Sequence, residues 1–316
     1  TRPHLAMGQE HINKREYTKA RRSFERARKV SPSDPQPILA LTDLLIKEAR
    51  VKEAQTYLNR EISQRPWSSV LHNGFGDIKL KIAQTSGQKR FYNEARESYD
   101  KALEINPSNH EARAQRVRAL LKLDEPQKAL TDLEWLEKQR YLGDLSFEFG
   151  RAQQALGRPK KAQRYYEKVL ERDREHLDAL RSMGSIMQAS KNTAKAKQFY
   201  EQALAVDPRD SETRFALGTL QLSEQDAGMA VEHLRVASEI KPQDPKLHYW
   251  YGRALESNGS EIKSEQLRNA YESAAMLINQ SEGTSKELCD IHFRVGVVHS
   301  QQAKELSLAL DDFTKA

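Results

Sequence analysis

The 316-residue chain has a single cysteine, Cys289, so it cannot form an intrachain disulfide bond or a two-cysteine metal or redox motif. It has no run of about 18 to 20 apolar residues, and its first ten residues, TRPHLAMGQE, lack the apolar core of a signal peptide. We therefore expect no membrane span and a cytoplasmic location. Because the sequence starts at Thr1 and not at Met, a targeting segment could have been removed.

Signatures of common enzyme classes are also missing. The sequence contains no GxxxxGK[ST] phosphate loop, no HExxH zinc-protease motif, no GxSxG nucleophile elbow and no strand-like alternation of apolar and polar residues. These absences remove the usual sites of nucleotide, metal-assisted and acyl-transfer chemistry. We predict a non-enzymatic chain with no catalytic residues, no metal, no cofactor and no small-molecule substrate.

Two pairs of histidines invite a metal interpretation. His4 and His11 are seven residues apart, as are His292 and His299. Seven residues span about 10 Å along a helix, which is too far for two ligands of one zinc ion. We predict that these histidines fill core positions, together with His72 and His248.

A repeat of 34 residues runs through the chain. Pro32 and Pro66 are 34 residues apart, as are Pro208 and Pro242, and each follows an apolar segment that a proline would end as a helix. A second pattern recurs along the chain: an aromatic residue, next an acidic or polar residue, and alanine or valine three residues after the aromatic one. It is found at Phe24, Tyr99, Tyr166, Tyr200, Tyr271 and Phe313.

The full pattern of W-x2-L-G-x2-Y, A-x3-F and P resembles the tetratricopeptide repeat. The unit at 177–210 carries it most completely, as Met183-Gly184, Ala196, Tyr200, Ala203 and Pro208. The resemblance implies an all-α, right-handed superhelical solenoid of about nine helix-turn-helix units. Their expected bounds are 1–34, 35–68, 69–109, 110–142, 143–176, 177–210, 211–244 and 245–281, forming a continuous array over 1–280, then a linker at 281–288 and an incomplete ninth unit at 289–316.

Two features of the units have structural implications. Glycine recurs in the expected first helices, and its cost of about 0.5 to 1 kcal/mol in a helix implies close packing on the second helix. The positions are Gly8, Gly76, Gly150, Gly184, Gly218, Gly252 and Gly296. The third unit is longer than the others, and we expect its extra residues, Thr85 to Phe91, in the turn between its helices. The sequence stops without a capping helix, so we expect the native protein to continue or a partner, including a second copy, to cover this end.

In the resembling family the first helices line a concave groove that binds peptides. Transferring its exposed positions predicts a partner-binding set of Asn73, Asp77, Arg118, Lys122, Phe147, Arg151, Gln154, Arg181, Phe215, Thr219, Tyr249 and Arg253. Arginine together with aromatic residues is typical of binding hot spots. We therefore predict a protein or peptide partner with acidic and apolar side chains, the alternative being that these are scattered surface residues.

Other functions remain open to different degrees. The chain could be an adaptor, or the recognition arm of a larger enzyme or of a secretion or polysaccharide-export assembly. Leu5, Gln9, Leu39 and Asp43 stand where some family members grip a C-terminal carboxylate, which disfavours that role. Nucleic-acid binding is also disfavoured: residues 1–34 hold nine Lys or Arg and four Asp or Glu, carrying +5 of the net charge of +6, but this charge lies mainly on an expected second helix.

Overall fold

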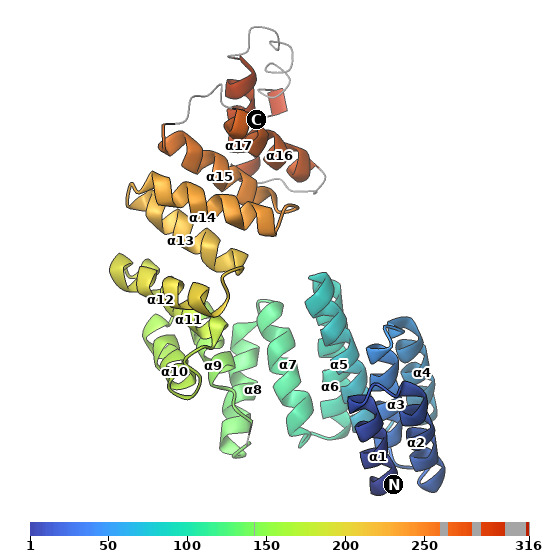
Figure 1. The fold of residues 1–316 in the computed structure, drawn as a ribbon. Helices are drawn as coiled ribbons and strands as arrows, with labels where there is room; N and C mark the ends of the chain where they lie inside the picture. The colour runs from blue at the N-terminus through green and yellow to red at the C-terminus, as the bar shows by residue number, and fades with distance from the viewer. Residues whose placement is uncertain (142, 260–264, 280–285, 301–313, 316) are drawn as a thin grey trace. The chain divides into compact units, whose positions relative to one another are not determined.

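The chain is built from helices alone in the part that the structure describes (Figure 1). The structure is a computed structural model, and it describes residues 1–141, 143–259, 265–279, 286–300 and 314–315. Seventeen helices and no strand occur within these ranges. The prediction of an all-α chain of repeated helix pairs is confirmed.

The helices alternate between a first and a second helix of each pair, and neighbouring helices pack on one another from α1 to α9 and from α11 to α17. The first helices are α1 (Arg2–Asn13), α3 (Gln36–Lys47), α5 (Ser69–Ser86), α7 (His110–Lys122), α9 (Ser146–Ala155), α11 (Leu177–Ala189), α13 (Ser211–Ser223), α15 (Pro245–Ser257) and α17 (Lys286–Ser300). The second helices are α2 (Tyr17–Val30), α4 (Val51–Gln64), α6 (Lys89–Ile105), α8 (Pro126–Lys138), α10 (Pro159–Arg172), α12 (Thr193–Val206), α14 (Ala227–Ile240) and α16 (Glu265–Asn279).

These helices fall into two compact units, Thr1–Tyr165 and Tyr166–Ala316, and the boundary between the two along the chain falls within α10. In the first unit, Leu133, Leu136 and Phe149 belong to a core shared by α7, α8 and α9. In the second unit, Leu255, Tyr271 and Ile291 belong to a core shared by α15, α16 and α17. Within each unit, successive pairs therefore share a buried apolar core, as expected for a repeat that cannot form a core alone.

Glycine in the first helix of a pair lies against a large side chain of the second helix. A Cβ atom added at Gly8 would lie 2.1 Å from the ring of Phe24, and one at Gly184 would lie 2.4 Å from the ring of Tyr200. The same relation holds for Gly76 with Tyr99, Gly218 with Leu234, and Gly252 with Tyr271. The prediction that these glycines serve close packing is confirmed.

The third pair corrects one expectation. Its extra residues lengthen both helices and not the turn, since α5 has 18 residues and α6 has 17, against 12 in α3 and 14 in α4. Only Gly87 and Gln88 separate α5 from α6, and Gly87 has a φ of 69°, the left-handed conformation that glycine favours. Ala83 and Tyr92 are buried on either side of the turn, so the extra segment has core contacts that keep it helical.

The histidines have two roles. His292 is 2% exposed and is a core residue, as predicted. His4, His11, His72 and His248 are only half-buried, so they do not fill the core. His72 and His248 each place Nε2 3.0 Å from the carbonyl oxygen of the proline six residues earlier, Pro66 and Pro242. They hold the turn between repeats, while the side chain of His299 lies outside the described residues.

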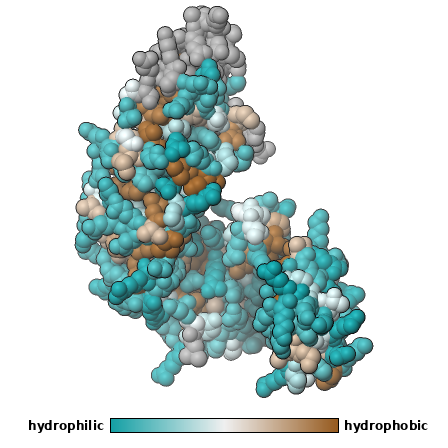
Figure 2. All heavy atoms as spheres, in the orientation of Figure 1, coloured by the Kyte–Doolittle hydropathy of each residue, from teal (hydrophilic) through white to brown (hydrophobic). Residues whose placement is uncertain are grey.

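The last predicted segments are described only in part. Helix α17 begins at Lys286, inside the predicted linker 281–288, whereas residues 281–285 and most of the ninth unit beyond residue 300 lie outside the described ranges. No described helix combines the length and the apolar character needed to cross a bilayer. Figure 2 shows a mostly hydrophilic face with hydrophobic side chains gathered in a few patches.

Candidate functional site

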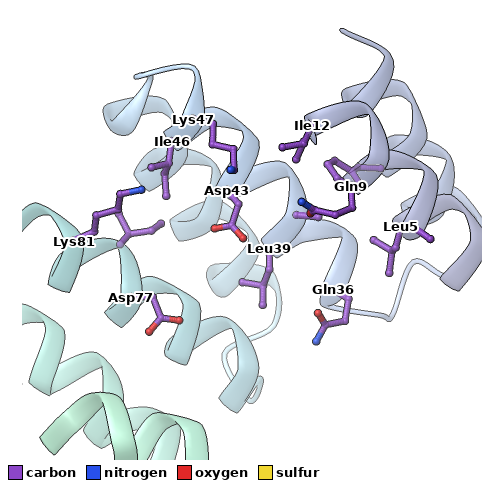
Figure 3. A pocket seen from close by; sticks show the side chains of 14 residues that line it. Leu5, Gln9, Ile12, Gln36, Leu39, Asp43, Ile46, Lys47, Asp77 and Lys81 are labelled. Atoms are coloured by element: carbon purple, nitrogen blue, oxygen red, sulfur yellow. The ribbon is translucent and has the colours of Figure 1, made fainter. Parts of the chain in front are cut away.

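A groove of about 590 Å³ lies in the first unit, along the first helices of its first three pairs (Figure 3). Helices α1, α3 and α5 supply nearly all of its lining. The lining residues are Leu5, Ala6, Gln9, Ile12, Phe24, Gln36, Leu39, Ala40, Asp43, Ile46, Lys47, Asp77, Ile78 and Lys81.

The 34-residue repeat orders these side chains into bands that cross the helices. Leu5 and Leu39 are equivalent positions of α1 and α3, and we call them the apolar band. Asp43 and Asp77 are equivalent positions of α3 and α5, one turn further along, and form the acidic band. Lys47 and Lys81, another turn along, form the basic band. Figure 3 shows this order along α3, from Leu39 through Asp43 to Lys47.

Asp77 is held by two hydrogen bonds within the first unit. The hydroxyl of Tyr99 donates to Oδ1 at 2.9 Å, and the amide Nδ2 of Asn73 donates to Oδ2 at 3.3 Å. Loss of hydration within the groove raises the pKa of Asp77 to about 6, and the negative charges of Glu111 and Asp43 act in the same direction. The charged carboxylate is therefore disfavoured at this position.

Asp43 has no hydrogen bond or ion pair from its side chain to another described residue. Its pKa is raised, first by loss of hydration and against the opposing charges of Lys81 and Lys47. No ion pair joins Asp43 or Asp77 to a described lysine or arginine, so neither carboxylate has a cation in direct contact. The acidic band is therefore a pair of carboxylates without an ion pair to a described residue, although the charges of Lys81 and Lys47 act on Asp43 from a distance.

The remaining predicted residues of the first unit lie on α7 and α9. Arg118 donates from Nε to Oε1 of Glu148 at 2.9 Å and from Nη1 to Gln115 at 3.0 Å, so its charge is already paired. Lys122 is exposed, and Arg151 is half-buried with no partner among the described side chains. Two further predicted residues on α9, Phe147 and Gln154, are half-buried.

In the second unit, the predicted residues are largely engaged by their own chain. Arg181 lies 3.1 Å from Asp210 and 3.0 Å from Glu212, and it also pairs with Asp178. Phe215 packs edge-on against Trp250, with ring centroids 6.2 Å apart. Thr219 donates its hydroxyl to a backbone carbonyl of its own helix.

Tyr249 is a core residue and not an exposed groove position. It is 6% exposed, because α17 packs over this part of α15. Its hydroxyl donates to Asp290 of α17 and accepts a hydrogen bond from Arg253 at 3.0 Å. Arg253 lies 4.0 Å from Asp290 and 3.7 Å from Glu256, so it too is close to in-chain acids.

The structure thus divides the predicted set. Asp77 lines the groove and Asn73 donates a hydrogen bond to it, whereas Arg118, Arg181 and Arg253 have acidic partners within the chain. The residues of α1 and α3 in the groove were missing from the predicted set. Their positions, 34 and 68 residues before those of α5, are the sequence signal that could have identified them.

Comparison with known proteins points to one repeat family. A family model described as tetratricopeptide repeat matches residues 153–217 and 187–249, and a second model with the same description matches residues 77–109. No curated protein sequence matches the chain.

Solved structures match the fold at low sequence identity. The human IFIT1 dimer with m7Gppp-AAAA is 17% identical, with a TM-score of 0.59 over 99% of this chain and 75% of that chain. A monomeric IFIT1 mutant with Gppp-AAAA is 18% identical, with the same TM-score over 99% of this chain and 76% of that chain. MamA from Desulfovibrio magneticus RS-1 is 19% identical, with a TM-score of 0.46 over 55% of this chain and 93% of that chain. The IFIT1 matches show a common fold.

Proposed function

Because the chain is a tetratricopeptide repeat protein, we propose that it acts by binding and not by catalysis, as a scaffold that holds a segment of a partner polypeptide. The observation that carries the proposal is the groove on α1, α3 and α5. Its apolar band joins α1 and α3, and its acidic and basic bands join α3 and α5, each at equivalent positions of two successive repeats. A polypeptide that crosses these helices would meet two side chains of each kind, one on each of two neighbouring first helices.

The proposed contact surface includes the predicted first-helix residues that remain accessible. In the first unit these are Asn73, Asp77, Arg118, Lys122, Phe147, Arg151 and Gln154, and the second unit separately offers Arg181, Phe215, Thr219 and Arg253. Lys122 and Arg151, beside Phe147, favour acidic and apolar side chains of the partner at α7 and α9. Tyr249 is left out because it is buried.

RNA fits the groove less well than a polypeptide. The printed names of the IFIT1 structures include capped RNA ends, which makes RNA a ligand class to consider. Asp43 and Asp77 place two carboxylates inside the groove, and their raised pKa values show that negative charge is already disfavoured there. A phosphate group would add to this repulsion.

Site-specific photo-crosslinking tests the proposal. A benzophenone amino acid replaces Gln9 or Gln36, two exposed groove residues, and in a matched control it replaces Lys52, an exposed residue of the second helix α4. Each variant is irradiated in lysate of the source organism, and the cross-linked peptides are identified by mass spectrometry. We expect the two groove positions to cross-link one segment of one partner and Lys52 not to do so. Cross-links to that segment from Lys52 alone would contradict the proposal.

A further inference from the structure

We propose that the groove on α1, α3 and α5 selects an extended polypeptide segment whose lysine or arginine side chains alternate with apolar ones. The basic side chains would contact Asp43 and Asp77, and the apolar side chains would contact Leu5 and Leu39. This inference rests on the proposed function and names the chemistry of the ligand.

The first observation is that neither Asp43 nor Asp77 forms an ion pair with a described residue. Lys47 follows Asp43 by four residues and Lys81 follows Asp77 by four residues, a helical spacing that permits ion pairs. Neither ion pair forms, and Figure 3 shows Lys81 extending away from Asp77. Elsewhere in the first unit, the buried carboxylate of Glu148 is matched by Arg118 at 2.9 Å. The acidic band therefore offers two carboxylates to a cation from outside the chain.

The second step is the surroundings of these carboxylates. Both carboxylates are exposed at the surface of the groove, and the apolar side chains of Leu39, Ile46 and Ile78 line it with them. A lysine or arginine side chain suits this site because its apolar stem can lie on the groove wall while its charged end reaches the carboxylate. Both acids have raised pKa values, and a bound cation would lower them again.

The third step is spacing. Packed helices lie about 8 to 10 Å apart, and an extended chain advances about 3.3 Å per residue. Side chains on one edge of an extended segment recur every second residue, about 6.6 Å apart, so basic side chains two residues apart would come nearest to reaching Asp43 and Asp77 on neighbouring first helices. The apolar band lies one helical turn from the acidic band, so apolar side chains on the other edge of the segment would reach Leu5 and Leu39.

Selection from a random peptide library tests this ligand class. The full chain is immobilised and selected against a phage-displayed library of random peptides, beside two variants of equal net charge. One variant is Asp43→Asn with Asp77→Asn. The control is Glu25→Gln with Glu104→Gln, two exposed residues of the second helices α2 and α6. Circular dichroism establishes that all three proteins are equally helical.

We expect the parent chain and the control to enrich peptides with lysine or arginine beside apolar residues. The affinity of the best peptide should fall about tenfold or more in the Asp43→Asn and Asp77→Asn variant, and it should weaken as salt is added. Changing both aspartates to lysine should shift the selection toward acidic peptides.

The possible failures are distinguishable. Peptides without basic residues, or peptides whose affinity is the same for the double variant, would overturn this inference and leave the proposed function standing. Enrichment of acidic peptides by the parent chain would also overturn it and would point to the basic band. No enrichment by any of the proteins would count against both proposals.

Discussion

At Gly184, in the middle of the first helix α11, there is room for a hydrogen atom but not for a methyl group. Tyr200 is 1% exposed, lies against Gly184, and is fixed at its far end by a hydrogen bond of 2.9 Å from its hydroxyl to Gln188. A ring held at both ends cannot move aside for a new Cβ atom. The close approach of the two helices therefore depends on glycine.

We predict that Gly184→Ala destabilises the second unit by about 1 to 3 kcal/mol, the usual cost of overpacking a core. The matched control is Gly228→Ala in α14, where an added Cβ atom would have no neighbour closer than 3.8 Å. This change should be neutral or slightly stabilising, because alanine is the better helix former. Thermal unfolding followed by circular dichroism checks both changes, and equal midpoints for the two variants would refute the packing argument.

The titration of Asp77 makes the stability of the folded chain fall as the pH rises, which is opposite to the effect of an aspartate whose pKa is lowered on folding. Its pKa rises from 3.8 to about 6 on folding, so between these values the folded chain binds the proton more tightly than the unfolded chain. The contribution of Asp77 to stability is therefore present at low pH and is lost as the pH rises toward 6. Asp77→Asn should raise the unfolding midpoint relative to the parent at pH 7 and change it little well below pH 3.8, where the carboxyl group is protonated in both the folded and the unfolded chain. A pKa near 4 for Asp77, measured by NMR, would show that the groove does not disfavour its charge.

The arginines show what residue patterns alone could and could not predict. Arg118 pairs with Glu148, 30 residues on, and Arg181 pairs with Asp210, 29 residues on. Such an offset joins facing positions of adjacent repeats, so it could be read from the period once the helix bounds are known. The presence of arginines beside aromatic residues suggested a binding surface. Composition does not show that Arg118 and Arg181 already pair with acidic side chains of the same chain.

At the scale of helices, aspartate links one repeat to the next at the start of α13. Asp210 is the N-cap of α13 and accepts a hydrogen bond of 2.9 Å from the backbone amide of Thr213. It also lies 3.1 Å from Arg181 of α11. One side chain therefore caps a helix and ties it to the preceding first helix.

We predict that Asp210→Ala costs about 1 to 3 kcal/mol, from the lost cap and the lost ion pair together. Asp244 is a matched comparison, because it caps α15 through the amide of Lys246 at 3.0 Å but has no ion pair with a described residue. Asp244→Ala should cost only the cap, about 0.5 to 2 kcal/mol. Denaturant unfolding measures both costs, and a smaller loss for Asp210→Ala than for Asp244→Ala would contradict the linking role.

The helix bounds were predictable wherever proline and glycine mark the period, and less so in the third pair. The extra length of the third pair suggested a long turn around Thr85 to Phe91, but the flanking helices continue up to Gly87 and Gln88 because Ala83 and Tyr92 are buried. Turn residues show where a chain reverses, whereas the length of a helix is decided by the contacts that its last residues make. Those contacts come from the paired helix and are not visible in a local pattern.

At the scale of the whole molecule, the two units suggest that the first can fold by itself. A fragment of residues 1–172 contains five helix pairs and keeps Phe149 stacked on Tyr165, with ring centroids 4.8 Å apart. A fragment of residues 1–140 ends after α8 and leaves Leu136 without the cover that α9 supplies. We predict that the longer fragment unfolds cooperatively with a higher midpoint than the shorter one. A less cooperative transition in the longer fragment would show that the first unit depends on the second.

The length of α5 and α6 also has a consequence for the order in which the chain folds. These are the longest described helices, and their hairpin is formed by residues close in sequence, so it gains the most from contacts that need little loop closure. A repeat array can start folding at any unit and spread to its neighbours. We expect folding of the first unit to start at this hairpin and to proceed toward both α1 and α9. Pulsed hydrogen exchange should then show amides of α5 and α6 protected before those of α1, whereas earlier protection of α1 would place the start elsewhere.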